Sequence, residues 1–442
     1  MSEVKVRLAG YNTDMEHGCD TPETISAAYA RISRDPRPVG ELRAQAASDL
    51  GAARSSNRRI VFDYGHGSVA EHAFFNFDVL GLSRLVGEAL QSFRLASFTE
   101  KSQRYVRMAE DWAVPPELEE TELAEPFSRH VRRLFELYGS AMEKLLDDGL
   151  SEGRAKEDAR YLLPLATTCQ MGMSLNAREL EHMIRKLSGH PLGEARALSE
   201  GLLNAAREVT PSLLRHLDPT EVDRMSWSHP PAGKSLADEV ELVRADDDGV
   251  VGPLLVRSRE GGSLERCRDR WRKLDAADAR GMFAIILDSL GPHDLPPREW
   301  ELARYTFDLC LSATAYAQLK RHRMCTLLVS RYEPSAGITV PPSFVSSGLE
   351  DMLRRAEASS AELWELAGHP VGAYALTNAH RRRVVVEMNA RELYHFSRLR
   401  EDAAAQWDIR GLAGRMASGA RGVAPLTLMR TGGKSELAGG GE

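Results

Sequence analysis

The sequence predicts an α/β (α+β) fold built as two modules, each with a central sheet flanked by long helices. Val4, Val6 and Leu8 alternate with polar residues, as in a strand that buries one face, so a strand is expected over 1–10. Residues 73–80 alternate in the same way. Apolar residues recur at helical spacing in longer segments, and these predict helices over 120–149, 152–163 and 176–206.

A repeated pentapeptide indicates that the two modules are copies of one another. Asn-Ala-Arg-Glu-Leu occurs at 176–180 and again at 389–393. Ser-Gln-Arg-Tyr at 102–105 precedes the first copy, and the shorter Ser-Arg-Tyr at 330–332 precedes the second. Repeats of about two hundred residues are duplicated domains rather than the short units of a solenoid. The sequence therefore predicts an internal duplication.

Composition places the module boundaries. Residues 228–262 are rich in Pro, Gly, Asp and Ser, which predicts a linker or an irregular insertion. This segment separates a first module at 1–227 from a second at 263–430. The glycine-rich tail at 431–442 is predicted to be disordered.

Shorter elements are expected within each module. In the first, Thr21 is placed at the N-cap of a helix that runs to about Ile32, and a second helix covers about 83–93. In the second module, the pattern predicts one strand and a series of helices. The strand is expected at 303–311, and the helices at 263–290, 318–324, 347–368, 370–380 and 389–417.

Composition also excludes several classes of protein. At 43% hydrophobic and 27% charged residues, the 442-residue chain is typical of a soluble globular protein. Its net charge of −7 argues against a general binder of nucleic acid polymers. No apolar run is long enough to cross a membrane, and the N-terminus lacks the apolar core of a signal peptide. Five scattered cysteines without a CxxC pair fit a reducing cytoplasm and predict no metal site.

A basic cluster in the second module is the first candidate site. Arg321, His322 and Arg323 follow Lys320, and Gln318 lies one helical turn before Arg321. An amide and a guanidinium on one face suit a uracil-like edge or a phosphate. The alternative is a solvated basic helix end, which is the usual meaning of a charge run.

The helix that begins near Asn389 supplies a second candidate. Asn389, Leu393, Phe396 and Arg400 form one continuous stripe. Polar groups that end an apolar stripe are costly unless a ligand or partner meets them. The alternative is that Asn389 caps the helix and Arg400 extends its charged end to solvent.

The first module carries a mixed polar group on an expected loop. Glu100, Ser102, Arg104 and Tyr105 combine a carboxylate, a hydroxyl and a cation, a set that often grips phosphate. Upstream, His66, Ser68, Glu71 and His72 match no common zinc spacing. We expect them to be structural or to contact a cofactor.

Taken together, these motifs resemble the flavin-dependent thymidylate synthase (ThyX) family. The second module contains Q-x-x-R-H-R at 318–323 and R-x-x-x-x-A-Q-W at 400–407. The first contains the S-x-R-Y element and A-R-x-x-L-P at 159–164. Both contain an N-A-R segment. The resemblance implies two fused ThyX-like modules.

Each module lacks what the other retains. In the first, R-H-R has become Ser92-Phe93-Arg94, and Leu187 stands where the late arginine is expected. In the second, a residue is missing before Ser330, and the E-H pair has become Glu299-Trp300. The resemblance therefore implies one composite active site, with groups drawn from both modules.

The resemblance implies an enzyme that methylates dUMP to dTMP with FAD, NADPH and methylenetetrahydrofolate, as a homodimer that forms a pseudo-tetramer. Rival functions are C5 methylation or hydroxymethylation of another pyrimidine nucleotide, and a non-catalytic flavin- or nucleotide-binding relic. The implied catalytic residues are Arg400 and Arg321. The implied dUMP contacts are Gln318, Arg321, Glu100, Ser102, Gln103, Arg104, Arg160 and Arg400. The implied FAD contacts are Ser68, Glu71, Glu100, Arg321, His322, Arg323, Asn389, Arg391 and His395.

Overall fold

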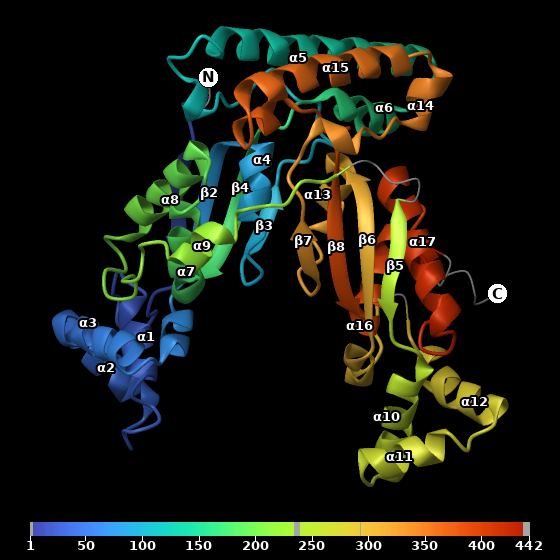
Figure 1. Cartoon of the computed structure of the whole chain (residues 1–442). Coiled ribbons are helices and arrows are strands. Elements are labelled where there is room, and N and C mark those ends of the chain that lie inside the picture. The colour runs from blue at the N-terminus through green and yellow to red at the C-terminus, as the bar shows by residue number, and fades with distance from the viewer. Residues whose placement is uncertain (1–2, 234–238, 292, 436–442) are drawn as a thin grey trace. The chain divides into compact units, whose positions relative to one another are not determined.

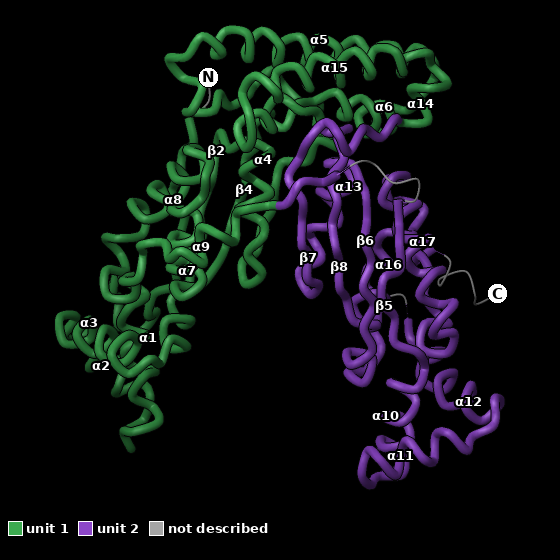
Figure 2. The backbone as a smooth tube through the Cα atoms, in the orientation of Figure 1, with its two compact units in different colours: residues 1–229, 341–377 green, residues 230–340, 378–442 purple. Residues whose placement is uncertain are grey.

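The computed structural model describes residues 3–233, 239–291 and 293–435 (Figure 1). The chain divides into two compact units (Figure 2): unit 1 contains residues 1–229 and 341–377, and unit 2 contains residues 230–340 and 378–442. In the described part of the chain, no helix is both long and apolar enough to cross a membrane. The predicted disorder of the tail at 431–442 is wrong for residues 431–435, where Thr431 is buried and the Ser435 N–H donates to Asp402 at 2.9 Å; from 436 onward the tail lies outside the described residues.

Unit 1 is built on a four-stranded antiparallel sheet in the order β1-β2-β4-β3. Its strands are β1 (Lys5–Tyr11), β2 (Phe74–Ser83), β3 (Ser97–Glu100) and β4 (Thr168–Asn176). Its helices from the first half of the chain are α1 (Glu23–Tyr29), α2 (Val39–Ser48), α3 (Leu50–Arg58), α4 (Arg84–Leu90), α5 (Ala124–Asp147), α6 (Glu152–Ala159), α7 (Ala177–Ser188), α8 (Gly193–Ala206) and α9 (Glu221–Met225).

Unit 2 repeats this sheet in the order β5-β6-β8-β7. Its strands are β5 (Val240–Ala245), β6 (Arg304–Ser312), β7 (Thr326–Val329) and β8 (Arg381–Asn389). Its helices are α10 (Asp248–Glu260), α11 (Leu264–Trp271), α12 (Ala276–Leu287), α13 (Ala313–Leu319), α16 (Ala390–Arg400) and α17 (Trp407–Val423). The α+β fold class is thereby confirmed.

The two sheets share one register. Phe74 opens β2 opposite Asn176, and Arg304 opens β6 opposite Asn389. Alternate residues of β2 and β6 are buried, including Phe75 and Phe77 in unit 1. Because both asparagines end the strand that leads into the N-A-R helix, equivalent positions in the two units can be assigned from the strand pairing.

The segment 341–377 belongs to unit 1 although it follows most of the second module in sequence. It contains α14 (Pro342–Ser346) and α15 (Glu350–Ala367), and α15 packs along α5, its counterpart from the first module (Figure 1). His130 of α5 lies 3.2 Å from the Ser360 hydroxyl of α15. The Tyr374 hydroxyl donates to Glu194 at 2.6 Å. Compact units and sequence modules therefore differ in this segment.

Several expected elements are corrected by the structure. Residues 228–262, expected to be irregular, contain β5 and α10. Residues 370–380 form only a short 3₁₀ turn, Val371–Ala375, before β8, which the sequence did not predict. α1 begins after Pro22, so Thr21 stands one position before the N-cap, but its hydroxyl still accepts the Glu23 N–H at 3.2 Å, as a capping side chain does, and donates to the Val209 carbonyl. The helices expected over 176–206 and 389–417 are each two helices separated by a turn.

His190 lies in the turn between α7 and α8, where it makes unit 1 sensitive to acid. Its Nδ1 accepts the Leu192 N–H at 3.1 Å, and its ring packs on Trp227 with centroids 4.6 Å apart. Burial, assisted by His229 and Arg196, lowers the pKa of His190 to about 3. The native ring thus stays neutral below the pH at which the unfolded chain binds a proton, about 6.5.

Stability is therefore expected to fall as pH drops from about 6.5 toward about 3, because only the unfolded state gains the proton. The contribution of His190 to this slope is at most about 1.4 kcal/mol per pH unit. In His190→Asn, the amide oxygen can still accept the Leu192 N–H but does not titrate. Urea unfolding at a series of pH values should give a shallower acid slope for this variant. An identical slope in wild type and variant would contradict the assignment.

Candidate functional site

The polar cluster of unit 2 is held by the end of α13 and by helix α16. Ser312 caps α13 by accepting the Ala315 N–H at 3.0 Å, which fixes the direction in which Gln318 and the following turn project. In that turn His322 is buried, whereas Arg321 and Arg323 on either side are exposed. The basic run is therefore not a uniformly solvated helix end: its imidazole points into the protein.

Both ring nitrogens of His322 have partners. Arg400 Nε donates to His322 Nε2 at 3.0 Å, and His322 Nδ1 lies 3.1 Å from a carboxylate oxygen of Glu392. Because an arginine always donates, Nε2 must be the acceptor, and the proton therefore resides on Nδ1 and is donated to Glu392. A second Arg400 nitrogen donates to the Gln318 carbonyl at 3.2 Å. These bonds fix the Arg400 guanidinium beside Gln318.

The charges of this cluster follow from its burial. Burial and then the positive charge of Arg400 lower the pKa of His322 to about 3, so the ring is neutral at physiological pH. Burial also raises the pKa of Glu392 and lowers that of His395, whose ring lies 5.4 Å from His322. Arg400, at the last turn of α16, therefore supplies the fixed positive charge of the group.

Three residues of this cluster lie close enough together to bind a metal ion, but the positive charge of Arg400 beside them disfavours one. Ligand atoms of His322, Glu392 and His395 lie within 4.8 Å of one another. The Nε2 atom of His322 already accepts from Arg400, and a metal ion there would face a guanidinium 3.0 Å from its ligand. We therefore assign this group to charge placement rather than to metal binding.

Gln318 and Asn389 are also held in place by named partners. Gln318 Nε2 donates to Gln406 Oε1 at 3.3 Å, and Gln406 is fully buried at the start of α17. Asn389 Oδ1 accepts the Glu392 N–H at 2.8 Å, so Asn389 is the N-cap of α16. The alternative interpretation of Asn389 as a helix cap is therefore confirmed for its side-chain oxygen. Arg400, in contrast, is held by His322 rather than extended freely to solvent.

Strand register corrects the position of the expected E-H pair in unit 2. Glu71 stands three residues before Phe74, the start of β2, and Glu301 stands three residues before Arg304, the start of β6. Arg178 lies 2.6 Å from Glu71, and its counterpart Arg391 lies 3.7 Å from Glu301. Glu301, rather than Glu299, therefore occupies the position of Glu71.

The polar group of unit 1 is organised by Glu157, a residue that the sequence did not single out. Glu157 is buried in α6 and forms an ion pair with Arg104 Nε. Its main-chain carbonyl accepts from Arg160 Nε at 3.1 Å. The Ser102 hydroxyl accepts the Arg104 N–H at 3.1 Å. Glu157 thus positions both guanidinium groups, one through its carboxylate and one through its main-chain carbonyl, and burial lowers the pKa of Arg160.

Glu100 and Gln103 flank this group. Glu100, at the end of β3, accepts from Gln91 at 2.9 Å and lies 3.5 Å from the buried guanidinium of Arg84. Gln103 is buried. The sequence does not single out Arg84 or Glu157, because each lies in a short helix with other charged residues and nothing in the local pattern indicates burial. Their burial was the informative feature, and it appears only in the fold.

Comparison with known proteins gives the family. The sequence profile of the family described as "Thymidylate synthase complementing protein" matches residues 15–212 and again residues 266–426. The chain belongs to this family. Two matched segments within one chain confirm the duplicated ThyX-like halves.

Some relatives match most of this chain, and others match about half of it. UPF0159 protein Ta1429 of Thermoplasma acidophilum is 24% identical over 431 residues, covering 83% of this chain and 86% of that protein. The flavin-dependent thymidylate synthase of Geobacter sulfurreducens is 33% identical over 214 residues, covering 46% of this chain and 85% of that protein. The crystal structure of the UMP/dUMP methylase PolB from Streptomyces cacaoi bound with 5-Br dUMP gives a TM-score of 0.38 at 22% identity, covering 48% of this chain and 93% of that chain.

In unit 1, the family's R-H-R segment has become the wall of a cavity of about 810 Å³. Phe93 takes the place of His322 and packs on His182 with centroids 5.5 Å apart. Glu71 and Arg178 line the same cavity, whereas Ser68 is exposed on the preceding turn. Leu187 is buried where unit 2 has Arg400. Unit 1 therefore has a cavity at this position but lacks the histidine–arginine pair of unit 2.

In unit 2, the family's S-x-R-Y segment has become structural. Ser330 is buried, and its hydroxyl accepts the Arg383 N–H at 2.9 Å. Arg331 pairs with Glu333 at 2.8 Å, and the buried Tyr332 ring lies 4.3 Å from the Arg382 guanidinium. This segment therefore fastens β7 to β8, so Ser330 is committed to backbone contacts.

Proposed function

We propose that this protein is an FAD-dependent methyltransferase that converts dUMP to dTMP, with methylenetetrahydrofolate as the carbon donor and NADPH as the reductant. The observation that carries the proposal is the fixed Arg400 guanidinium of unit 2, held between His322 and the Gln318 carbonyl. Family membership and the names of the relatives support this chemistry. We further propose a cytoplasmic homodimer that forms a pseudo-tetramer.

The groups of unit 2 would act on the uracil ring. Gln318 and Arg321 would bind its polar edge, and Arg400 would stabilise negative charge as the ring ionises. A preorganised cation is effective in this role because it does not need to reorient during the reaction. The neutral state of His322 stabilises this arrangement. A neutral ring accepts a hydrogen bond from Arg400, whereas a charged imidazolium would repel the guanidinium.

The groups of unit 1 would hold the nucleotide's anionic end. Ser102, Arg104 and Arg160 present a hydroxyl and two guanidinium groups, which suit a phosphate. Glu100 and Gln103 would contact the base or ribose. We propose that both units contribute to one class of composite site, within a chain or between two chains. This proposal rests on the complementary losses: unit 1 lacks the histidine–arginine pair, and unit 2 has committed its serine segment to structure.

The residues present fit FAD, which would supply the hydride-carrying chemistry. Arg398 lies three residues after His395 on α16 and is 3% exposed. Its Nε and Nη1 have no hydrogen-bond partner within the described residues. Buried donors of this kind usually meet a ligand or water, and a guanidinium suits the cofactor's diphosphate. Asn389, Arg391, His395, Arg321, His322 and Arg323 would hold the cofactor from unit 2, and Ser68, Glu71 and Glu100 from unit 1.

The first test is direct. Purified protein is expected to be yellow, to contain one FAD per chain, and to form dTMP from dUMP only when methylenetetrahydrofolate and NADPH are present. UMP should be assayed in parallel, because a C5 methylase of another pyrimidine nucleotide would prefer it. Protein that binds no flavin, or that turns over UMP but not dUMP, would contradict the proposed function. Two FAD per chain would contradict the single class of composite site.

A further inference from the structure

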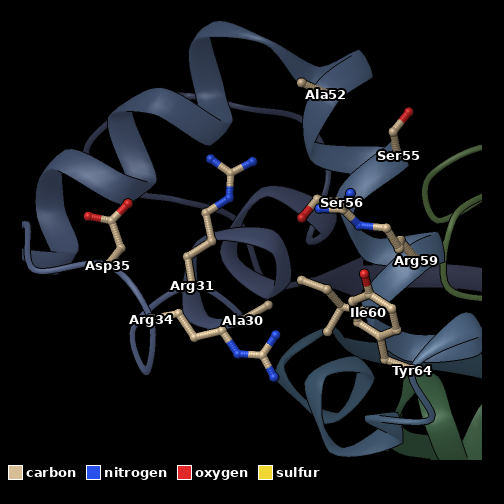
Figure 3. A pocket seen from close by; sticks show the side chains of 10 residues that line it. All are labelled: Ala30, Arg31, Arg34, Asp35, Ala52, Ser55, Ser56, Arg59, Ile60 and Tyr64. Carbon is tan, nitrogen blue, oxygen red and sulfur yellow. The ribbon is translucent and has the colours of Figure 1, made fainter.

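Unit 1 contains a second cavity, of about 590 Å³, whose lining residues differ from all those discussed above (Figure 3). We propose that it is a separate site for a nucleoside di- or triphosphate. One wall is the turn that follows α1, with Arg31 and Arg34. The other is α3 and the π-helical turn Arg59–Asp63, which contribute Arg59 and end at Tyr64. Single π-helical turns are frequent at functional sites.

The cavity carries an unmatched positive charge. Arg31, Arg34 and Arg59 line it, and within the described residues no carboxylate lies within 4 Å of these groups. Asp35 also lines the cavity, but it is bound by both arms of Arg37, at 2.9 and 2.6 Å. The acidic lining residue is therefore already neutralised by an arginine outside the cavity. Three guanidinium groups thus line the cavity against one carboxylate that Arg37 already binds, and such an excess of positive charge suits a ligand with more than one phosphate.

The remaining lining suits the body of a nucleoside. Ala30 and Ile60 provide an apolar surface, and the Tyr64 ring is half exposed and available to stack. The Arg59 guanidinium lies 5.9 Å from the Tyr64 ring centroid, so the cationic and aromatic groups adjoin. The volume falls within the range of small-molecule sites, about 300–1,000 Å³. An inorganic anion alone would leave this surface unused.

The walls are fixed by a buried polar network behind the cavity. Asn57 of α3 is fully buried and donates to the Glu23 carbonyl at 3.0 Å. The Glu23 carboxylate accepts from Arg54 at 2.5 Å and from the Ser212 N–H at 2.6 Å. α1 and α3 are thereby held together before any ligand arrives, which lowers the ordering cost of binding.

Calorimetric titration of the full chain with ATP, tripolyphosphate and adenosine tests the proposal. ATP is expected to bind, and Arg34→Ala and Arg59→Ala are each expected to weaken its affinity by about tenfold, the cost of one charged hydrogen bond. Arg58→Ala is the matched control, because Arg58 is the exposed neighbour of Arg59 but does not line the cavity. It should stay within about twofold of wild type. Should Arg59→Ala unfold, Arg59→Lys, which keeps the charge, replaces it.

Flavin supplies the decisive competition. Arg34 lies 3.5 Å from His66, next to the segment proposed to contact FAD, so the cavity could instead hold part of that cofactor. A separate site predicts that saturating FAD leaves ATP affinity unchanged. Displacement of ATP by FAD, equal binding of ATP and tripolyphosphate, or an equal loss in Arg58→Ala would each overturn the proposal. Because the assay measures binding only, its failure is distinct from failure of the methylation assay.

Discussion

Arg400→Ala is expected to lower dTMP formation by about 10²–10³-fold, the loss usually seen when one preorganised charge-stabilising group is removed. The substitution removes the guanidinium without cutting a core side chain, because Arg400 is only partly buried at the end of α16. It also removes the hydrogen bond to His322 and the repulsion that helps to lower the pKa of that ring. The measurement is steady-state dTMP formation at saturating dUMP.

The controls for Arg400 come from the same unit. Arg400→Lys keeps the charge but loses the forked contact to His322 and Gln318, so an intermediate rate is expected. Arg331→Ala removes an arginine that pairs with Glu333 in the structural serine segment, and should retain most of the activity. Flavin content and melting temperature are measured for each variant. If Arg331→Ala is the inactive protein and Arg400→Ala is not, the site assignment in unit 2 is wrong.

Arg104→Ala is expected to raise the KM for dUMP by about tenfold to a hundredfold, the range for one or two charged hydrogen bonds to a phosphate. The physical basis is the ion pair with Glu157, which fixes the guanidinium, while the Ser102 hydroxyl accepts the Arg104 main-chain N–H. Arg107→Ala is the matched control, since Arg107 is an exposed arginine of the same loop. A loss of kcat with unchanged KM would contradict phosphate binding by Arg104.

The two variants together decide where composite sites form. Co-expression of Arg400→Ala and Arg104→Ala chains pairs an intact unit 1 with an intact unit 2 on different chains. If sites form between chains, mixed dimers regain part of the wild-type activity. If sites form within a chain, every site carries one substitution, and the activity at dUMP concentrations well below the KM of Arg104→Ala stays at the level of the single variants. If each single variant alone keeps wild-type activity, the proposal of a composite site is wrong.

Much of the fold could be predicted from local pattern. The strand at the N-terminus, β2, β6 and the long helices α5 and α15 carry clear periodicity, and each was expected close to its observed position. β4 and β8 are not predicted, because β4 has few β-branched or aromatic residues and β8 opens with a run of three arginines, so neither composition is typical of a strand. β5 is not predicted, because it lies within a segment that is rich in Pro, Gly, Asp and Ser.

The candidate site divides in the same way. Arg400, Gln318, Ser102 and Arg104 were selected from motif spacing, because their residue types are chemically distinctive. Glu157 is not predicted, because it is one of three acidic residues in α6 and its sequence context does not indicate that it binds Arg104. Glu301 was misaligned with Glu299, since only the pairing of Arg304 with Asn389 fixes the register.

Residue identity and spacing were sufficient to show that this chain is a duplication, which family it belongs to, and which half contains which distinctive residues. These properties depend only on which residues occur and on their spacing along the chain. Tertiary structure alone decided that His322 is buried and neutral, that Ser330 serves the sheet, and that α15 joins unit 1. Burial and partner choice depend on residues far apart in the chain, so local pattern does not contain them.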